Sequence, residues 1–141
     1  MAGTFKFELV TPERKLIPRP GDDPKSVAIA EATEAIVPGM DGQFTVLAGH
    51  APAISALRPG VIDIKLTSGR RRIFVRGGIV EVEPDQLVIL AQQVIDLDDA
   101  EPGLLAKELA TAKEMLAAAG DDTARMVAQD AIDQLTAAGA A

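Results

Sequence analysis

The spacing of the apolar residues changes near residue 95, and this change limits the fold more than any other feature of the sequence. Before that point, apolar and polar residues alternate in short runs such as Val61–Leu66, which indicates β-strands with one buried face. The runs are joined by short segments rich in turn residues, such as Thr67–Gly69 and Glu83–Asp85. Strands this short and closely spaced predict an antiparallel β-sandwich or flattened barrel over residues 1–95.

Beyond residue 95 the apolar residues follow the 3.6-residue period of an α-helix. One stripe stops before Gly120, and a second follows Asp121–Thr123, which can cap a helix. The stripes consist of Leu105, Leu109, Ala112 and Leu116, and of Ala124, Val127 or Ala128, Ala131 and Leu135. We therefore predict a mainly β protein with an added α part, in which an αα-hairpin occupies residues 96–141. Because its facing residues are largely alanine, the hairpin should bury little area and be held weakly.

The formal net charge of −7 lies entirely in the predicted hairpin. Residues 1–95 carry eleven basic and eleven acidic residues, whereas residues 96–141 carry three basic and ten acidic residues. Because neither part is net basic, we expect no nucleic-acid partner. The chain begins directly with a strand pattern and has no apolar run of membrane-spanning length, so we expect membrane association only through a partner.

The sequence lacks the residues that most catalytic and metal sites require. It contains no Cys and a single His, so neither a Cys nucleophile nor a set of three or four nitrogen and sulfur ligands for zinc is available. Of the three serines, Ser26 and Ser55 are considered as alternative nucleophiles, but a hydrolase triad also needs a neighbouring His. We therefore expect no catalytic residue, metal or cofactor, and we interpret His50 as a hydrogen-bonded or interface residue of a loop.

Four other segments have structural interpretations. The acidic run from Asp96 to Glu101 lacks the glycine and spacing of an EF-hand and is expected to cap a helix. Arg70–Arg72 could dock an acidic partner, but its strand pattern favours a solvated strand edge. Gly77–Gly78 indicates a bulge or a close approach of two backbones, since no helix or Lys of a phosphate loop follows. Residues 16–26 contain three prolines and predict an exposed loop.

Four segments stand in an order and at a spacing that point to a family. They are Leu9-Val10-Thr11-Pro12-Glu13-Arg14, Val37-Pro38-Gly39-x-Asp41-Gly42-x-Phe44-x-Val46-Leu47-x-Gly49-His50-Ala51-Pro52, Leu57-x-Pro59-Gly60-Val61 and Gly77-Gly78-Ile79-Val80-Glu81-Val82. With the β-then-αα plan, they resemble the epsilon subunit of the F-type rotary ATP synthases of bacteria and chloroplasts, equivalent to the mitochondrial delta subunit. The resemblance covers nearly the whole chain, with Thr45 standing where the family usually has Gly.

The resemblance implies a non-catalytic central-stalk subunit with a ten-stranded antiparallel β-sandwich. In the family, this sandwich binds the gamma subunit and rests on the polar loops of the c-ring, at the cytoplasmic face of the bacterial plasma membrane. The matching segment gives seven candidate interface residues: Met40, Asp41, Gly42, Gln43, Phe44, Gly49 and His50. The turns at Pro38-Gly39 and Asp41-Gly42 fit this role, because they should present a rigid docking shape at one end of the sandwich.

The family's C-terminal hairpin folds onto the sandwich or extends toward the alpha and beta subunits, where it blocks rotation in the hydrolysis direction. Basic residues of the last helix are expected to meet acidic residues of beta. Here residues 121–141 contain Arg125 as their only base beside four aspartates, so the attraction becomes net repulsion. The hairpin is therefore expected to be at most a weak inhibitor.

Some family members bind ATP through an Ile-Asp-x-x-Arg-Ala motif. The matching residues here are Ile95, Asp96, Asp99 and Ala100, with Asp99 in the place of the arginine. A carboxylate near phosphates removes a charge-assisted contact and adds repulsion, so the motif is interpreted as vestigial. Two alternatives remain open: a nucleotide-sensing regulatory module of the same complex, and an unrelated β-sandwich that binds a small ligand.

Overall fold

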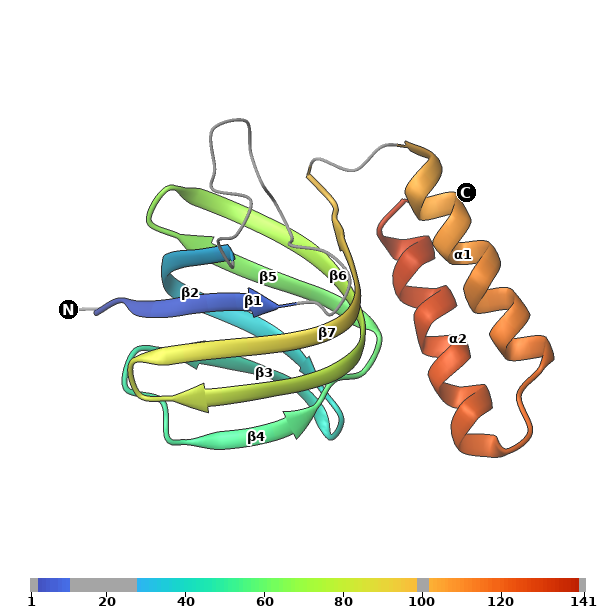
Figure 1. Cartoon of the computed structure of the whole chain (residues 1–141), viewed down its shortest axis with the longest axis horizontal. Coiled ribbons are helices and arrows are strands. Elements are labelled where there is room, and N and C mark those ends of the chain that lie inside the picture. The colour runs from blue at the N-terminus through green and yellow to red at the C-terminus, as the bar shows by residue number, and fades with distance from the viewer. Residues whose placement is uncertain (1–2, 11–27, 99–101, 140–141) are drawn as a thin grey trace.

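The computed structural model describes residues 3–10, 28–98 and 102–139. These residues form seven β-strands followed by two α-helices (Figure 1). The strands are β1 (Phe5–Val10), β2 (Ala28–Gly39), β3 (Gly42–Leu47), β4 (Ala53–Ala56), β5 (Gly60–Leu66), β6 (Gly69–Glu83) and β7 (Gln86–Asp96), and the helices are α1 (Pro102–Ala117) and α2 (Asp122–Ala137). The β-then-αα order predicted from the sequence is confirmed, and the predicted loop at 16–26 lies outside the described residues.

The strands form a flattened barrel with two added edges. Hydrogen-bonded neighbours follow the order β1-β7-β6-β5-β2, and β1 also pairs with β2, which closes the ring. β3 extends the ring beside β2, and β4 extends it beside β6 (Figure 1). One pairing differs from the antiparallel prediction, because β1 runs parallel to β7.

The described residues contain seven strands, fewer than the ten of the family plan, because the longest strands serve both layers. β6 pairs with β5 through Gly69–Val75 and with β4 through Ile79–Val82. β2 likewise pairs with β1 in its first half and with β3 and β5 in its second half, with a register shift between Ala32 and Glu34. Each strand that crosses from one layer to the other is therefore counted as one strand rather than as two.

The crossing of β6 depends on Gly77 and Gly78, as the sequence indicated. Both have positive φ, +70° and +127°, and a Cβ on Gly78 would lie 1.9 Å from the carbonyl oxygen of Leu90. Before the glycines, odd-numbered residues of β6 point into the core of the sandwich. After them, the even-numbered residues Val80 and Val82 do so. Gly77–Gly78 is therefore a close backbone approach, as the second of the two sequence interpretations has it, and not a bulge, because the register of β6 against β7 continues unbroken across it. Beyond it, Ile79 points outward.

The core of the sandwich is built from the alternating apolar residues. Ile62 and Ile64 of β5 are fully buried, whereas Asp63 and Lys65 between them reach solvent, as a half-buried strand requires. The same pattern brings side chains from β1, β2, β3, β5, β6 and β7 into one cluster: Phe5, Phe7, Leu9, Ala32, Ala35, Val37, Val46, Leu57, Ile62, Ile64, Ile73, Val75, Val80, Val82, Leu87, Ile89 and Ala91.

The helices pack beside the sandwich on the half of the sheet where β5, β6 and β7 meet (Figure 1). Asp121 caps α2, since its Oδ1 accepts a hydrogen bond from the Ala124 N–H at 2.7 Å. A second apolar cluster joins the helices to the sheet and consists of Phe74 and Ile95 with Leu109, Ala112, Ala131 and Leu135. The predicted stripes are confirmed except at Ala124, which is exposed.

Candidate interaction site

The seven candidate interface residues lie along β3 and its two flanking turns. Met40 and Asp41 form the turn between β2 and β3, whereas Gly49 and His50 follow the other end of β3. The seven residues therefore do not form a single turn, because a six-residue strand separates Met40 and Asp41 from Gly49 and His50. The Asp41-Gly42 sequence favours a hairpin turn, and β2 then pairs with β3 as an antiparallel ribbon.

Phe44 connects the two turns through its ring. A Cβ on Gly39 would lie 2.8 Å from Cε1 of Phe44, so the ring packs directly against the Gly39 backbone. The same ring lies 6.3 Å from the imidazole of His50, centroid to centroid. Nδ1 of His50 is 2.7 Å from the carbonyl oxygen of Ala51, so His50 is a hydrogen-bonded loop residue, as interpreted from the sequence.

Backbone hydrogen bonds hold both turns against neighbouring strands. The Met40 N–H donates to the carbonyl oxygen of Ala56 on β4 at 2.9 Å. At the other end of β3, the Gly49 N–H donates to the carbonyl oxygen of Pro84 in the β6–β7 turn at 2.7 Å. The turns are therefore rigid parts of the sandwich surface, which suits a docking site.

An apolar outer face on β1, β4, β6 and β7 adjoins the Met40 turn, and the sequence analysis missed it. Antiparallel pairing sets Ala56 beside Ile79 and Ile79 beside Leu90, while Ile54 lies two residues from Ala56 on the same face of β4. Ile54 is 73% exposed, Ile79 43% and Leu90 39%. We call this set the open face; its apolar members are Val10, Ile54, Ala56, Ile79, Val88 and Leu90.

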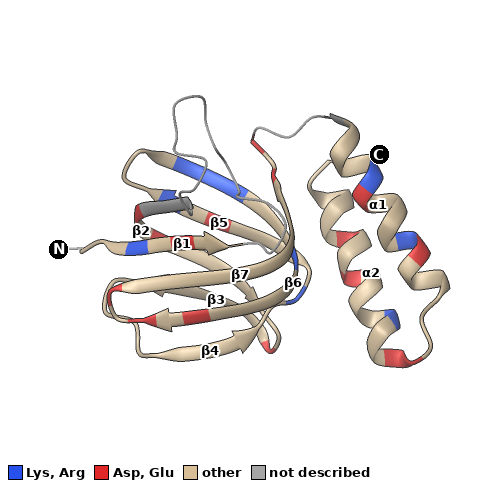
Figure 2. Ribbon diagram, in the orientation of Figure 1, with Lys and Arg blue, Asp and Glu red and all other residues tan. Residues whose placement is uncertain are grey.

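The open face carries few charges and lies apart from the helices. Figure 2 shows β4 and β7 almost free of charged residues, and the register places the charged residues of the face on β1 and β6, as Lys6, Glu8, Glu81 and Glu83. The helices instead contact Phe74 and Ile95, on the other halves of β6 and β7. The unbroken apolar run Leu87–Ala91 was the available sequence signal, because an alternating strand is apolar on one face only. Exposed apolar patches of this kind mark interaction sites.

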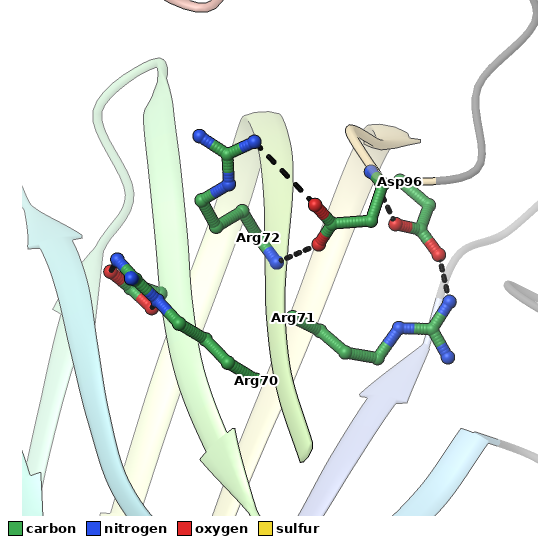
Figure 3. Close-up of polar contacts among 6 residues, drawn as sticks. Arg70, Arg71, Arg72 and Asp96 are labelled. Carbon is green, nitrogen blue, oxygen red and sulfur yellow. Dashed lines mark hydrogen bonds and ion pairs between the residues drawn. The ribbon is translucent and has the colours of Figure 1, made fainter.

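The two described residues of the nucleotide motif, Ile95 and Asp96, lie in different surroundings. Ile95 is buried beneath the helices, and the carboxylate of Asp96 forms an ion pair with Arg71 (Figure 3). Both of these charged side chains are nearly buried. Asp99 and Ala100 lie outside the described residues. The charge of Asp96 is thus engaged within the chain.

Two residues of the arginine run pair with two residues of the acidic run, which neither sequence interpretation included. Arg72 donates from its backbone N–H to Oδ2 of Asp98 at 2.8 Å, and its carbonyl oxygen accepts from Leu97, so it has backbone partners beyond β5 (Figure 3). The run is therefore not a free strand edge at Arg72. Asp96 and Asp98 pair with arginines, and the rest of the acidic run, which was expected to cap a helix, lies outside the described residues.

Arg70 forms the third pair of this cluster, with Asp63 on the neighbouring strand β5. Its Nε lies 2.8 Å from Oδ1 of Asp63. This charge-assisted hydrogen bond lowers the pKa of the Asp63 carboxyl below its ordinary value. The Arg70 pair joins the start of β6 to β5, whereas the pairs of Arg71 and Arg72 join it to the end of β7 and the residues just after it.

Comparison with known proteins identifies the family. The fold defines the chain as a β-sandwich protein with an appended αα-hairpin. The family model described as ATP synthase, Delta/Epsilon chain, beta-sandwich domain matches residues 23–96. An ATP synthase epsilon chain of Mesorhizobium japonicum is 38% identical over 138 residues, covering 96% of this chain and 93% of the relative. That of Parvibaculum lavamentivorans is 37% identical over 136 residues, covering 96% and 95%. The chain therefore belongs to the ATP synthase epsilon chain family.

Two solved structures have a similar fold. One is a chain in the cryo-EM structure of the Euglena gracilis mitochondrial ATP synthase, OSCP/F1/c-ring, with a TM-score of 0.60 and 21% identity, covering 81% of this chain and 75% of that chain. The other comes from the central stalk/c-ring of the Tetrahymena thermophila mitochondrial ATP synthase, with a TM-score of 0.59 and 15% identity, covering 95% of both chains. Neither α1 nor α2, the helices in the described part of the chain, is long and apolar enough to cross a membrane.

Proposed function

We propose that this chain is a non-catalytic central-stalk subunit of an F-type ATP synthase, which couples rotation of the gamma subunit to the proton-driven c-ring. Family membership supports this role, and the similar solved chains come from assemblies whose titles name the c-ring and, in one case, the central stalk. In this proposal the chain is peripheral, at the cytoplasmic face of the bacterial plasma membrane, and meets the membrane only through the complex.

The open face is the observation that carries the proposal. It offers exposed aliphatic side chains on hydrogen-bonded strands, so a partner that covers it gains apolar burial without ordering a loop. The Met40 turn is bonded to β4 at the edge of this face. We assign the open face and the seven candidate residues along β3 to contacts with gamma and the polar loops of the c-ring. A rigid surface of this kind can transmit torque.

We further propose that residues 1–95 and 96–141 act as separate units and that the second is at most a weak inhibitor of ATP hydrolysis. Arg125, the only base after residue 120, pairs with Asp122 within α2. Approach of this helix to acidic residues of beta is then opposed by its other aspartates. The engagement of Asp96 by Arg71 disfavours the nucleotide-sensing alternative, and no observation favours an unrelated small-ligand site.

Replacing Ile54 with Glu tests the proposed docking surface. A buried charge without a partner is costly, so the Ile54→Glu chain should fold normally but lose binding to a purified gamma–c-ring complex by about 100-fold, given roughly 3 kcal/mol for such a burial. Leu104→Glu is the matched control, because Leu104 is an exposed leucine on α1. Binding should be measured by co-purification and titration, with circular dichroism as the check on folding. Equal binding by both variants would contradict the assignment.

The candidate residues along β3 need a functional test. Asp41→Lys and His50→Glu change charge at exposed or half-exposed turn positions, so the fold should persist. We expect both to loosen the stalk and to lower proton-driven ATP synthesis in reconstituted vesicles relative to ATP hydrolysis. Unchanged synthesis in both variants would show that these turns do not contact the neighbouring subunits.

A further inference from the structure

Glu108 is the one charged residue in the described part of the chain that is buried. It lies on α1 and points to the sandwich, where its Oε1 is 2.5 Å from Nε of Arg76 on β6. The side chains are 7% and 21% exposed, so both charges have left most of their water. Such charges are tolerated together but strongly penalised when one loses its partner.

A second ion pair joins the other helix to the sandwich. Nε of Arg58, in the segment between β4 and β5, lies 3.1 Å from Oδ2 of Asp130 on α2. This pair is more exposed than the first. Each helix is thus held by one ion pair, and the cluster around Phe74 and Leu135 forms the apolar part of the same contact.

The apolar part of this contact is small. The hairpin contributes two large buried side chains, Leu109 and Leu135, with Leu105 and Ile132 partly buried beside them, and the other buried members, Ala112 and Ala131, are alanines. Alanines remove little area from water, so apolar burial alone gives the hairpin a weak preference for one docked position. The buried pair adds a steep free-energy penalty for every arrangement that separates Arg76 from Glu108 while either charged side chain stays buried.

We propose that the Arg76–Glu108 pair is a latch that holds the αα-hairpin on the sandwich, so that the free chain rests with the inner faces of α1 and α2 covered. The hairpin becomes available to another surface only when this pair separates. The inference concerns the contact within the chain and does not depend on which partner covers the open face.

Spin labels on an otherwise cysteine-free chain can test the latch. The sequence contains no Cys, so Thr45→Cys on the sandwich and Ala117→Cys at the end of α1, both exposed, accept labels selectively. Double electron–electron resonance should give one narrow distance distribution in the parent chain. Glu108→Gln should raise the ratio of undocked to docked chains at least tenfold, with helix content unchanged by circular dichroism.

Two further variants separate the latch from a general effect of mutation. Glu114→Gln changes an exposed glutamate of the same helix and should leave the distribution unchanged. The charge swap Arg76→Glu with Glu108→Arg should restore docking. Three outcomes would each overturn the latch. They are an unchanged distance distribution in Glu108→Gln, an equal rise in undocked chains in Glu114→Gln, and a charge-swap chain that stays undocked. If Glu108→Gln loses helix content, Arg76→Gln removes the other charge of the pair instead. The same increase in undocked chains is then expected.

Discussion

The sandwich and the hairpin are held together in different ways. The sandwich fills one cluster with large aliphatic and aromatic side chains from six of its strands, and it leaves no charged group in that cluster. The hairpin meets the sandwich through a few leucines, several alanines and two ion pairs. The difference teaches that the shape of this protein is set by apolar packing in one part, whereas the placement of the other part relies on charge.

The largest expected effect comes from disturbing the close backbone approach of β6 and β7 at Gly78. Gly78→Ala places a Cβ 1.9 Å from the carbonyl oxygen of Leu90 at a φ of +127°, so clash and strain together should cost about 3 kcal/mol or more. Gly69 also has a positive φ, but a Cβ there would have nothing within 4 Å, so Gly69→Ala measures the backbone strain alone. Gly120→Ala is the control with neither a clash nor a positive φ. Urea unfolding should rank the losses Gly78, Gly69, Gly120. A Gly78 variant as stable as the Gly120 variant would contradict the close approach at Gly78.

Truncating a buried aliphatic residue in each region compares the two directly. Ile62→Ala opens a cavity in the sandwich core and should lower the free energy of unfolding by roughly 3 kcal/mol. Leu135→Ala opens one under the hairpin and should mainly raise hydrogen exchange in α1 and α2, with little change in β5. Mass-spectrometric exchange on both variants makes the comparison. Equal acceleration of exchange in β5 and α2 by Leu135→Ala would show that the two regions unfold as one unit.

A smaller effect is expected at the start of α2. Asp121→Ala removes the side-chain acceptor for the Ala124 N–H and should destabilise the hairpin by about 1 kcal/mol. Asp122→Ala is the neighbouring control, because that carboxylate makes only an exposed ion pair with Arg125. Thermal melting followed by helical circular dichroism should separate the two variants. Equal melting temperatures would remove the capping role of Asp121.

The smallest effect concerns the pH dependence of the sandwich. Arg70 lowers the pKa of Asp63 in the folded chain, so the stabilisation is complete above the unfolded pKa of about 3.9 and is lost as pH falls through the lower folded value. Asp63→Asn should therefore be less stable than the parent at pH 7, and the gap should close in acid below about pH 4. Urea midpoints over this pH range provide the measurement. A gap that widens in acid would reverse the assigned sign.

Much of the fold could be predicted because local patterns carried it. Alternation located β5, the Gly77–Gly78 pair located the close backbone approach, and Asp121 located the start of α2. The parallel pairing of β1 with β7 could not be predicted, because it joins segments about 80 residues apart that no local turn connects. The same holds for the strands that cross between layers.

The candidate site was predicted less completely. The sequence marked Met40 and His50, but it could not show that their turns are bonded to Ala56 on β4 and to Pro84 in the β6–β7 turn. The open face depends on the register of β4 against β6, which places Ile54 near Ile79 although 24 residues separate them. The pairing of Asp96 with Arg71 depends in the same way on contacts across the sheet. Non-local pairing, which single-sequence patterns do not encode, accounts for each of these differences.

Methionine footprinting tests the central claim most directly, because each region carries an exposed methionine. Met40 adjoins the open face and is 44% exposed, whereas Met126 lies on α2 and is 55% exposed. The measurement compares their rates of oxidation by mass spectrometry in the free chain and in the assembled gamma–c-ring complex. The account predicts that Met40 becomes several-fold slower to oxidise on assembly while Met126 keeps its rate. Protection of Met126 with an unchanged rate at Met40 would contradict it.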